Sequence, residues 1–233
     1  MNTPLYRVVM DHLVDRIASG AMPPGAMLPS ETQLGADLGV AQGTARKALM
    51  ELETRGLVTR VQGRGTFVTQ RTTEDSLFRF FRLRQHDGTM DAPELLNETV
   101  RERAATRSER ATLHGEPARV FEISRLRALG HADKIVEKTI VSTARFPGLN
   151  DRAPLPNTLY VFFQQAYSCM ILRADEALQA THPSADIAAL LQITDTTPVL
   201  QVSRVAYDLL DQVVELRTLT CRTDRHHYTV SLT

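Results

Sequence analysis

One stretch, residues 39–70, constrains the fold more than any other part of this sequence. Its apolar side chains first recur at helical spacing, so one stripe can pack inward while small and basic residues face outward. Gly56 then supplies a left-handed end to that helix. Beyond it, two short apolar segments, 57–61 and 66–68, pair across a glycine-arginine-glycine tip as a hairpin. The stretch therefore predicts a slim cationic helix followed by a basic wing, a geometry that suits the reading of duplex DNA.

An alternative interpretation is that the basic residues of this stretch form an ordinary solvated surface. Two features favour the DNA interpretation. Arg64 has a glycine on each side, so backbone phosphates could approach the tip closely. The outward positions near the start of the helix are small or basic, namely Gly43, Arg46 and Lys47.

The chain has no overall charge that would draw it to nucleic acid. Its 233 residues include 27 Lys and Arg against 27 Asp and Glu, so the formal net charge is zero. Any contact with nucleic acid must therefore come from local arrangement. No apolar run approaches membrane-spanning length, and the N-terminus lacks the order of residues typical of a signal peptide. We expect a cytoplasmic protein of two domains with no membrane partner.

Cysteine and histidine usage argues against metal chemistry. The two cysteines, Cys169 and Cys221, are too few and too far apart for a disulfide framework or a four-cysteine metal site. Among the seven histidines only His226 and His227 lie close together, and neighbours on a strand point to opposite sides. We expect no metal and no cofactor.

Two helices precede the constraining stretch. Apolar residues step by four from Leu5 to Ile17, and Gly20 ends the pattern. A loop rich in proline and glycine follows. The second helix begins at Ser30, where Ser30 and Gln33 have capping-box spacing. A short second helix, a tight turn and a third helix have the spacing of a helix-turn-helix.

This region resembles the winged-helix domain of the GntR family of bacterial transcription regulators. The resemblance is carried, in order, by LYRVVMDHLVDRIASG, PPGAMLPSETQLGADLGV, TARKALMELETRGLV and GRGTFV. It implies a dimeric repressor or activator that binds double-stranded operator DNA of palindromic sequence. From the residues and the resemblance together, the expected DNA-binding residues are Ser30, Glu31, Gln42, Gly43, Thr44, Arg46, Lys47, Gln62, Gly63, Arg64 and Gly65.

The chain departs from the family pattern at two places. Thr32 stands where the family often has arginine, and Ala41-Gln42 stands where it usually has Ser-Arg. Loss of the serine removes a helix cap that is typically worth about 1 kcal/mol. Arginine commonly pairs with guanine whereas glutamine pairs with adenine, so we hypothesise that Gln42 shifts one operator position toward adenine. The alternative is that Gln42 contacts only phosphate or water.

Residues 71–76 are polar and could not hold a core, so we interpret them as a linker between a winged helix-turn-helix domain, 1–70, and a second domain, 77–233. The periodicity of the second domain predicts a mostly antiparallel sheet with helices, and hence an α+β fold. The expected strands are 78–83, 99–104, 118–129, 134–142, 199–210 and 212–221, and the expected helices are 106–113, 157–169 with Asn157 as its cap, and 185–191.

The second domain is similar to the UTRA effector domain that accompanies GntR-type heads in the HutC subfamily, whose fold is like that of chorismate lyase. The similarity is carried by SRLRALGHADKIVEKTIVS, FPGL, NTLY, ADIAALLQI and VVELRTLTCRTDRHHYTV. It implies a domain that senses a ligand and dimerises. From the residues and the resemblance together, the expected effector-binding residues are Arg125, Arg127, Glu137, Thr158, Tyr160, Glu215, Arg217 and Cys221.

Three arginines suggest the chemistry of the effector. Arg125 and Arg127 share one side of a strand with apolar neighbours, and a half-buried pair of cations needs an anionic partner. Arg217, if it faces the same pocket, favours a doubly charged or dicarboxylate ligand. The alternatives are that Arg125 and Arg127 are solvated or paired with a glutamate, and that Arg217 is a surface residue. The candidate partners are Glu122, Glu137 and Glu215.

Three functions follow from these features. The first is a ligand-responsive regulator, a repressor released from its operator by a small anionic metabolite. The second is a lyase-like enzyme, although we find no nucleophile with its base, metal-ligand set or cofactor loop in the second domain. The third is an architectural DNA-binding protein without a ligand.

Overall fold

The computed structural model describes residues 3–130 and 133–230, and the chain divides into two compact units. The first unit contains residues 1–73 and 160–172, and the second contains 74–159 and 173–233. We describe each unit by itself. The first unit thus includes a segment, 160–172, that falls within the predicted second domain, and the boundaries 1–70, 71–76 and 77–233 remain a prediction.

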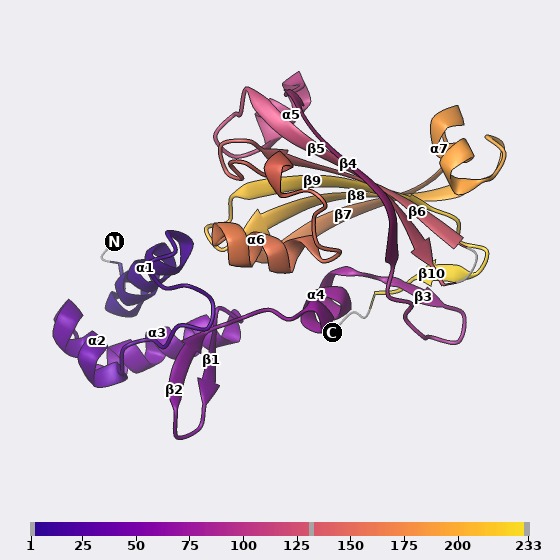
Figure 1. Ribbon diagram of the computed structural model, residues 1–233. Helices are drawn as coiled ribbons and strands as arrows, with labels where there is room; N and C mark the ends of the chain where they lie inside the picture. Colours follow the sequence, from indigo (N-terminus) through magenta and orange to yellow (C-terminus); the bar gives the residue numbers. More distant parts are fainter. Residues whose placement is uncertain (1–2, 131–132, 231–233) are drawn as a thin grey trace. The chain divides into compact units, whose positions relative to one another are not determined.

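The amino-terminal part of the first unit has three helices and a hairpin, as predicted (Figure 1). The elements are α1 (Leu5–Ala18), α2 (Glu31–Leu38), α3 (Gln42–Thr54), β1 (Val58–Val61) and β2 (Gly65–Val68). The strands pair antiparallel, with Val61 opposite Gly65. The apolar stripe of each helix is buried, and the core includes Val9, Leu13, Ile17, Leu34, Ala45, Ala48, Leu49 and Leu52.

Local signals determine where these helices begin and end. The hydroxyl of Ser30 accepts from the backbone N–H of Gln33 at 3.2 Å, and the Gln33 side chain accepts from the backbone N–H of Ser30 at 2.8 Å. The predicted capping box is therefore confirmed. Gly39 and Gly56 take positive φ angles of 65° and 70°, as expected where helices end. At the start of α3, Ala41 provides no capping side chain within the described chain.

Gly35 on α2 sets how closely the helix-turn-helix can pack, and the sequence analysis did not single it out. A Cβ atom at this position would lie 2.9 Å from the carbonyl oxygen of Val40 and 3.6 Å from the backbone nitrogen of Gln42. The backbone N–H of Val40 also donates to the carbonyl of Gly35 at 2.9 Å. The tight turn thus approaches the backbone of α2 at a position where a larger residue does not fit.

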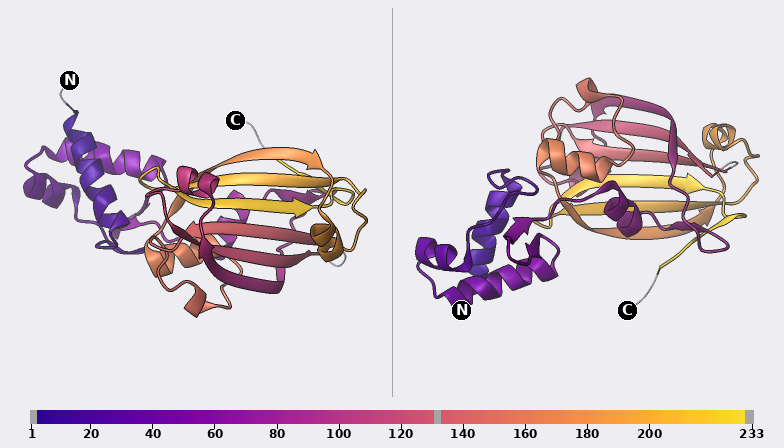
Figure 2. Two further views of the ribbon diagram at one scale, coloured as in Figure 1. Left: turned by 90° about the horizontal axis from the view of Figure 1, so that it is seen from above. Right: turned by 60° about the horizontal axis from the view of Figure 1, so that its bottom comes forward.

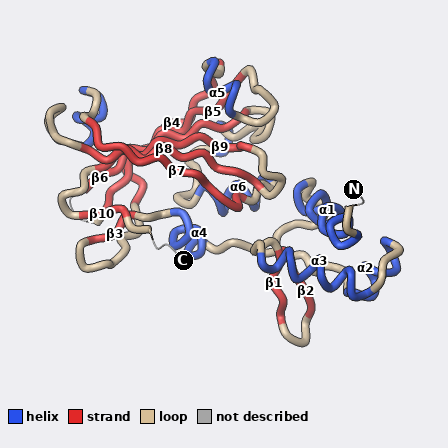
Figure 3. Tube along the Cα trace, turned by 180° about the vertical axis from the view of Figure 1, so that it is seen from behind, coloured by secondary structure: helices blue, strands red, loops and turns tan. Residues whose placement is uncertain are grey.

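The second unit is built on a six-stranded sheet in the order β4-β5-β6-β9-β8-β7 (Figures 1 and 3). The strands are β4 (Glu94–Ala104), β5 (Arg119–Leu129), β6 (Asp133–Ser142), β7 (Ile171–Thr181), β8 (Val199–Asp208) and β9 (Val213–Cys221). Four of the neighbouring pairs have an antiparallel register in the described residues, in agreement with the predicted α+β class. Figure 2 shows these strands running alongside one another in two further views.

Shorter elements surround this sheet. Helices α5 and α7 lie at opposite ends of the strands (Figure 1). Helix α7 packs on an apolar cluster through Leu191 and Ile187, and Leu113, directly after α5, belongs to another apolar cluster. A small sheet joins β3 to β10. The bounds are α4 (Thr73–Phe80), β3 (Leu83–Gln85), α5 (Arg107–Thr112), η1 (Asn150–Arg152), α6 (Leu159–Tyr167), α7 (Ala185–Leu191) and β10 (His226–Tyr228). No helix in the described ranges is long and apolar enough to cross a membrane.

Three local predictions were wrong. The segment 78–83 is not a strand, because α4 runs to Phe80 and β3 begins only at Leu83. Strand β7 was not predicted, because its outer half is exposed and reads as polar. Asn157 does not begin its helix, which starts at Leu159. Its side chain is instead held between the carbonyl of Pro93 and the guanidinium of Arg127.

Candidate functional site

The first candidate surface lies where α2 and α3 begin. Glu31, in the first turn of α2, accepts from Nε of Arg46 at 2.9 Å and lies 3.5 Å from Nε2 of Gln42. The same carboxylate is 3.6 Å from Nη2 of Arg60 on β1. Three of the expected DNA-binding residues, Glu31, Gln42 and Arg46, are therefore brought together from two helices.

The wing borders the same surface. Gly63 and Gly65 take positive φ angles of 73° and 124°, which turn the chain around Arg64. The guanidinium carbon of Arg64 lies 5.9 Å from the ring centroid of Phe67. A depression of about 620 Å³ is lined by residues of α2 and of the wing, among them Ser30, Glu31, Gln33, Arg64, Gly65 and Thr66.

The start of α3 offers an open backbone beside this depression. Gly43 is exposed, and within the described chain a Cβ built on it would have no neighbouring atom closer than 4 Å. Thr44 is half-buried next to it. Lys47 is exposed, as expected, and its Nζ lies 4.3 Å from the ring centroid of Tyr6 on α1. Gln62, at the hairpin turn, is exposed.

Several basic residues of this surface already have acidic partners. Arg55 lies 3.4 Å from Glu51, and Arg60 lies 3.2 Å from Glu53. These carboxylates are accessible to solvent, and exposed ion pairs contribute little to stability. The same guanidiniums are thus able to exchange a carboxylate for a phosphate at little cost.

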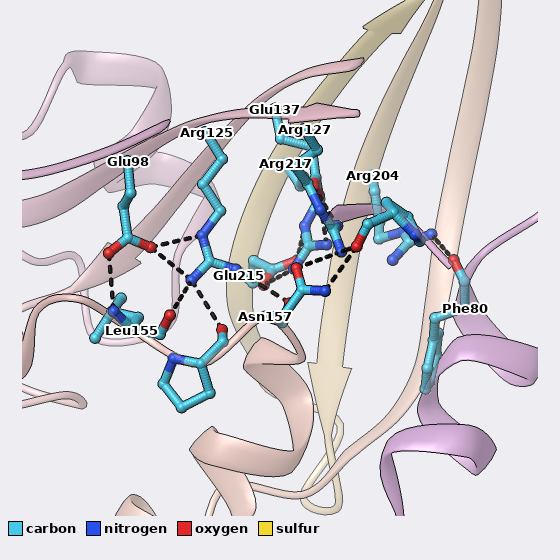
Figure 4. A network of polar contacts seen from close by, with 12 residues as sticks. Phe80, Glu98, Arg125, Arg127, Glu137, Leu155, Asn157, Arg204, Glu215 and Arg217 are labelled. Atoms are coloured by element: carbon cyan, nitrogen blue, oxygen red, sulfur yellow. Dashed lines mark hydrogen bonds and ion pairs between the residues drawn. The ribbon is translucent and has the colours of Figure 1, made fainter. Parts of the chain in front are cut away.

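The second candidate site is a buried group of charges in the second unit, which we call the arginine cluster (Figure 4). Its members are Glu98, Arg125, Arg127, Glu137, Glu215 and Arg217. The strand register explains how they meet, since Glu98, Arg125 and Glu137 are consecutive cross-strand partners on β4, β5 and β6. The side chain of Arg125 is 2% exposed and that of Glu137 is 4% exposed, so these charges are held out of water.

Arg125 is fully engaged within the chain. Its Nη2 lies 2.6 Å from Glu98, and its Nε donates to the same carboxylate at 2.7 Å. The remaining donors reach the backbone carbonyls of Leu155, Pro156 and Asn157 at 2.9–3.2 Å. Arg125 therefore ties β4 and β5 to the segment that precedes α6. Burial lowers the pKa of Arg125, and the Glu98 carboxylate opposes that effect.

Glu137 bridges the other two arginines. One of its oxygens accepts from Nη1 of Arg127 at 2.7 Å, and the other accepts from Nη1 of Arg217 at 2.9 Å. Arg217 also donates twice to Glu215, at 3.0 and 2.9 Å. Burial alone would raise the pKa of Glu137, but the charges of Arg127 and Arg217 outweigh it and lower the pKa to about 2.

The three arginines of the cluster are each paired with a glutamate, so they are not unpaired cations. The chain supplies three glutamates for three arginines, so the cluster is neutral. Of the partners considered from sequence for Arg125 and Arg127, Glu137 pairs with Arg127. Glu215 instead pairs with Arg217, and Glu122 pairs with Arg101 and Arg103. The side chain of Arg217 is only 13% exposed, so the alternative that it is a surface residue was wrong.

The other expected effector residues are Cys221, Thr158 and Tyr160. Cys221 packs in an apolar cluster with Leu83, Leu129 and Ile135, and burial raises the pKa of its thiol to about 12. Thr158 immediately precedes α6. Tyr160 is buried and belongs to the first compact unit.

Glu98 is the functional candidate that sequence reasoning missed. The strand was predicted to begin at Thr99, so Glu98 was placed outside the sheet. Extending that strand by a few residues would have put Glu98 directly opposite Arg125, as the register shows. Opposite charges at facing positions of neighbouring strands attract, so this pairing was a usable signal.

Comparison with known families and proteins identifies both parts of the chain. Residues 5–68 match the model of bacterial regulatory proteins of the gntR family, and residues 92–227 match the UTRA domain. The chain is 26% identical over 231 residues to the probable fructoselysine utilization operon transcriptional repressor of Escherichia coli strain K12, covering 97% of this chain and 93% of the relative.

Two further similarities bear on the separate parts. The histidine utilization repressor of Pseudomonas aeruginosa is 44% identical over 75 residues, which cover 32% of this chain and 30% of that protein. The crystal structure of the ligand-binding domain of a GntR-family transcriptional regulator from Bordetella bronchiseptica superposes with a TM-score of 0.59 at 28% identity. It covers 66% of this chain and 98% of that domain.

Proposed function

Because the chain belongs to the gntR family of bacterial regulatory proteins and carries a UTRA domain, we propose that it is a transcriptional repressor released from its operator by a small molecule. The surface around Glu31, Arg46 and the wing would bind operator DNA. The arginine cluster would respond to the effector. The chain would act as a homodimer on a palindromic operator, with two heads about one helical turn apart.

The observation that carries this proposal is the meeting of α2 and α3 at Glu31. A recognition helix must present a few side chains in fixed positions, because base readout depends on geometry. Glu31 accepts from Arg46 at 2.9 Å, so this guanidinium is oriented before DNA arrives, and Gln42 lies beside it, 3.5 Å from Glu31. The open backbone at Gly43 and the basic wing supply the surroundings that such contacts need.

The effector is inferred to be small and anionic, although the cluster is neutral. Each guanidinium–glutamate pair can be exchanged for a guanidinium–ligand pair if the ligand carries a carboxylate or phosphate. In addition, Nε of Arg127 is buried without a hydrogen-bond acceptor among the described residues. A buried donor of this kind is costly unless an acceptor reaches it, which favours a polar ligand at the cluster.

The test is selection of binding sites from a random duplex pool with the full chain, followed by band-shift assays. Enrichment of a palindrome and at least tenfold preference over scrambled duplex at moderate salt are expected, and Arg46→Ala should remove most of that preference. Uniform binding to all duplexes, or none, would overturn the proposal. A metabolite screen by thermal shift then identifies the effector, since a ligand at a hundred times its dissociation constant stabilises by about 2.7 kcal/mol.

The two alternatives from sequence analysis are less well supported. The relatives compared above are named as regulators, which favours a regulator over a lyase-like enzyme built on the second unit. The same names favour a regulator over an architectural DNA-binding protein. A band-shift assay with and without the identified effector separates a sensor from an architectural protein.

A further inference from the structure

The end of helix α4 is held by an arginine from the sheet. Nη2 of Arg204, on β8, donates to the carbonyl oxygen of Phe80 at 2.5 Å, and Phe80 is the last residue of α4. Carbonyls at a helix C-terminus lack partners within the helix and carry partial negative charge, so a cation there is stabilising. The guanidinium also lies 5.8 Å from the ring centroid of Phe80.

Arg204 is itself oriented by the strand beside it. Its Nε donates to Glu176 on β7 at 2.7 Å, and the other oxygen of Glu176 accepts from the hydroxyl of Tyr228. The side chains of Arg204 and Glu176 are only 10% and 17% exposed. The hydrogen bond from Arg204 to α4 is therefore largely buried and charge-assisted, which makes it stronger than such a bond at the surface.

Arg204 also stands next to the arginine cluster. It is the direct cross-strand partner of Arg217, with both residues on neighbouring strands of the sheet (Figure 4). Like charges at such positions repel unless each has its own carboxylate. In the structure Arg217 pairs with Glu215 and Glu137, while Arg204 pairs with Glu176. The two facing arginines thus pair with different acids.

We propose that Arg204 is a positioning residue. When an anionic effector binds Arg217, Arg204 releases the carbonyl of Phe80 at the end of α4 and pairs with Glu215 instead. The proposal rests on the proposed function, because it assigns a route by which that effector acts. Residues 73 and 74 at the start of α4 are where the chain passes from the first compact unit to the second. Loosening α4 therefore changes the segment that leads to the DNA-binding head.

The exchange follows from the cost of a buried charge. Glu215 is 0% exposed and pairs with Arg217, so losing that guanidinium to a ligand removes an ion-pair partner from a carboxylate that water cannot reach. Arg204 lies diagonally across the strand pair from Glu215, within the reach of a long side chain. A carboxylate attracts a guanidinium more strongly than a neutral carbonyl does, so Arg204 leaves Phe80.

Hydrogen exchange of the full chain tests this without knowledge of the effector. Arg217→Gln mimics withdrawal of Arg217 and is expected to speed amide exchange in residues 73–81 about tenfold, as loss of a charge-assisted contact would do. Arg204→Gln should produce the same increase, and adding Arg217→Gln to it should produce no more. Arg173→Gln is the matched control, because Arg173 also pairs with acids, Asp175 and Asp211, but its side chain is 47% exposed.

A rescue variant separates partner exchange from general destabilisation. Arg217→Gln combined with Glu215→Gln removes the acceptor to which Arg204 would move, so exchange in residues 73–81 should return to the wild-type rate. An unchanged rate in Arg217→Gln would overturn the proposal. It would equally be overturned if the rescue variant exchanged as fast as Arg217→Gln, since that is the behaviour of a merely damaged fold.

A different measurement, the band-shift assay, tests the proposed function itself. Exchange rates in residues 73–81 report the movement of Arg204 whether or not the chain binds DNA. Absence of any preferred duplex in the band-shift assay would remove the repressor function and leave the partner exchange standing. Preferential DNA binding together with exchange rates that do not respond to Arg217→Gln would remove only the route through Arg204.

Discussion

Glu31 and Arg46 join the two helices of the helix-turn-helix through an ion pair of 2.9 Å between Oε2 and Nε. Arg46 is more than half exposed, whereas the side chain of Glu31 is 21% exposed. The acid is therefore the fixed partner and the arginine is the accessible one. The pair aims the guanidinium, and it also lowers the positive charge that the free head presents to DNA.

Replacing Glu31 with Gln should reduce discrimination between operator and random duplex more than it reduces affinity for DNA. The variant loses the partner that aims Arg46 but gains a unit of positive charge, so binding to random duplex should strengthen at low salt. The ratio of operator to random affinity is expected to fall about tenfold, the loss typical of one specific contact. Competition band shifts at fixed salt measure this ratio. Glu51→Gln serves as control, because it also removes an acid that pairs with an arginine but lies outside the turn.

Gly35→Ala should destabilise the first unit by about 1–3 kcal/mol, the usual cost of forcing a methyl group into packed structure. The new Cβ would lie 2.9 Å from the Val40 carbonyl, and backbone cannot move aside as a side chain would. Urea unfolding of the full chain, followed by helical circular dichroism, measures the change. A variant as stable as the wild type would show that the turn relaxes freely.

Gly43→Ala should differ from Gly35→Ala in its effect on stability. Its Cβ meets no atom within 4 Å in the described chain, and alanine favours helix over glycine by up to about 1 kcal/mol, so stability should hold or rise. Operator affinity should nevertheless fall severalfold if DNA approaches the backbone at this point. An unaltered affinity in the band-shift assay would place Gly43 outside the interface.

The contrast between these glycines shows what could be predicted from sequence in the head. Helix periodicity, the Ser30 capping box and the wing hairpin are local patterns, and the structure confirms all three. The outward position of Gly43 was predicted from the same periodicity. The tight fit of Gly35 depends on how closely a turn approaches a helix, and no local pattern encodes that distance.

In the second unit, prediction from sequence was limited by strand register and by an edge strand. The sheet class and most central strands were predicted, because alternation is strong where one face is buried. Strand β7 is at an edge, and its exposed half has little apolar signal. Glu98 and Arg204 acquire their roles from residues that face them across strands, and pairing between distant segments is set by the whole sheet. Glu98 could have been placed opposite Arg125 by extending the predicted strand, whereas no local pattern identifies the partners of Arg204.

Gln42 should direct one operator position toward adenine. In the free head its Nε2 lies 3.5 Å from Glu31, a weak contact that leaves the amide available to pair with N6 and N7 of adenine. Selection from a random pool should show adenine at that position, Gln42→Ala should lose the preference, and Gln42→Arg should replace adenine with guanine. Persistent demand for guanine by the wild type would contradict the assignment.

Glu137 should make the second unit sensitive to acid. Its pKa is lowered from 4.5 in a model peptide to about 2 in the folded chain, so the unfolded chain binds the proton more readily. The stability that this ionised carboxylate contributes is present above about pH 4.5 and is lost as the pH falls toward 2, for a total of about 3 kcal/mol. Urea unfolding between pH 7 and pH 3 should show this decline in the wild type. Glu137→Gln should be less stable at pH 7, because Arg127 and Arg217 lose their shared partner, and its stability should fall less on acidification. The exposed Glu94→Gln should follow the wild-type profile, whereas equal slopes for the wild type and Glu137→Gln would mean that acid acts elsewhere.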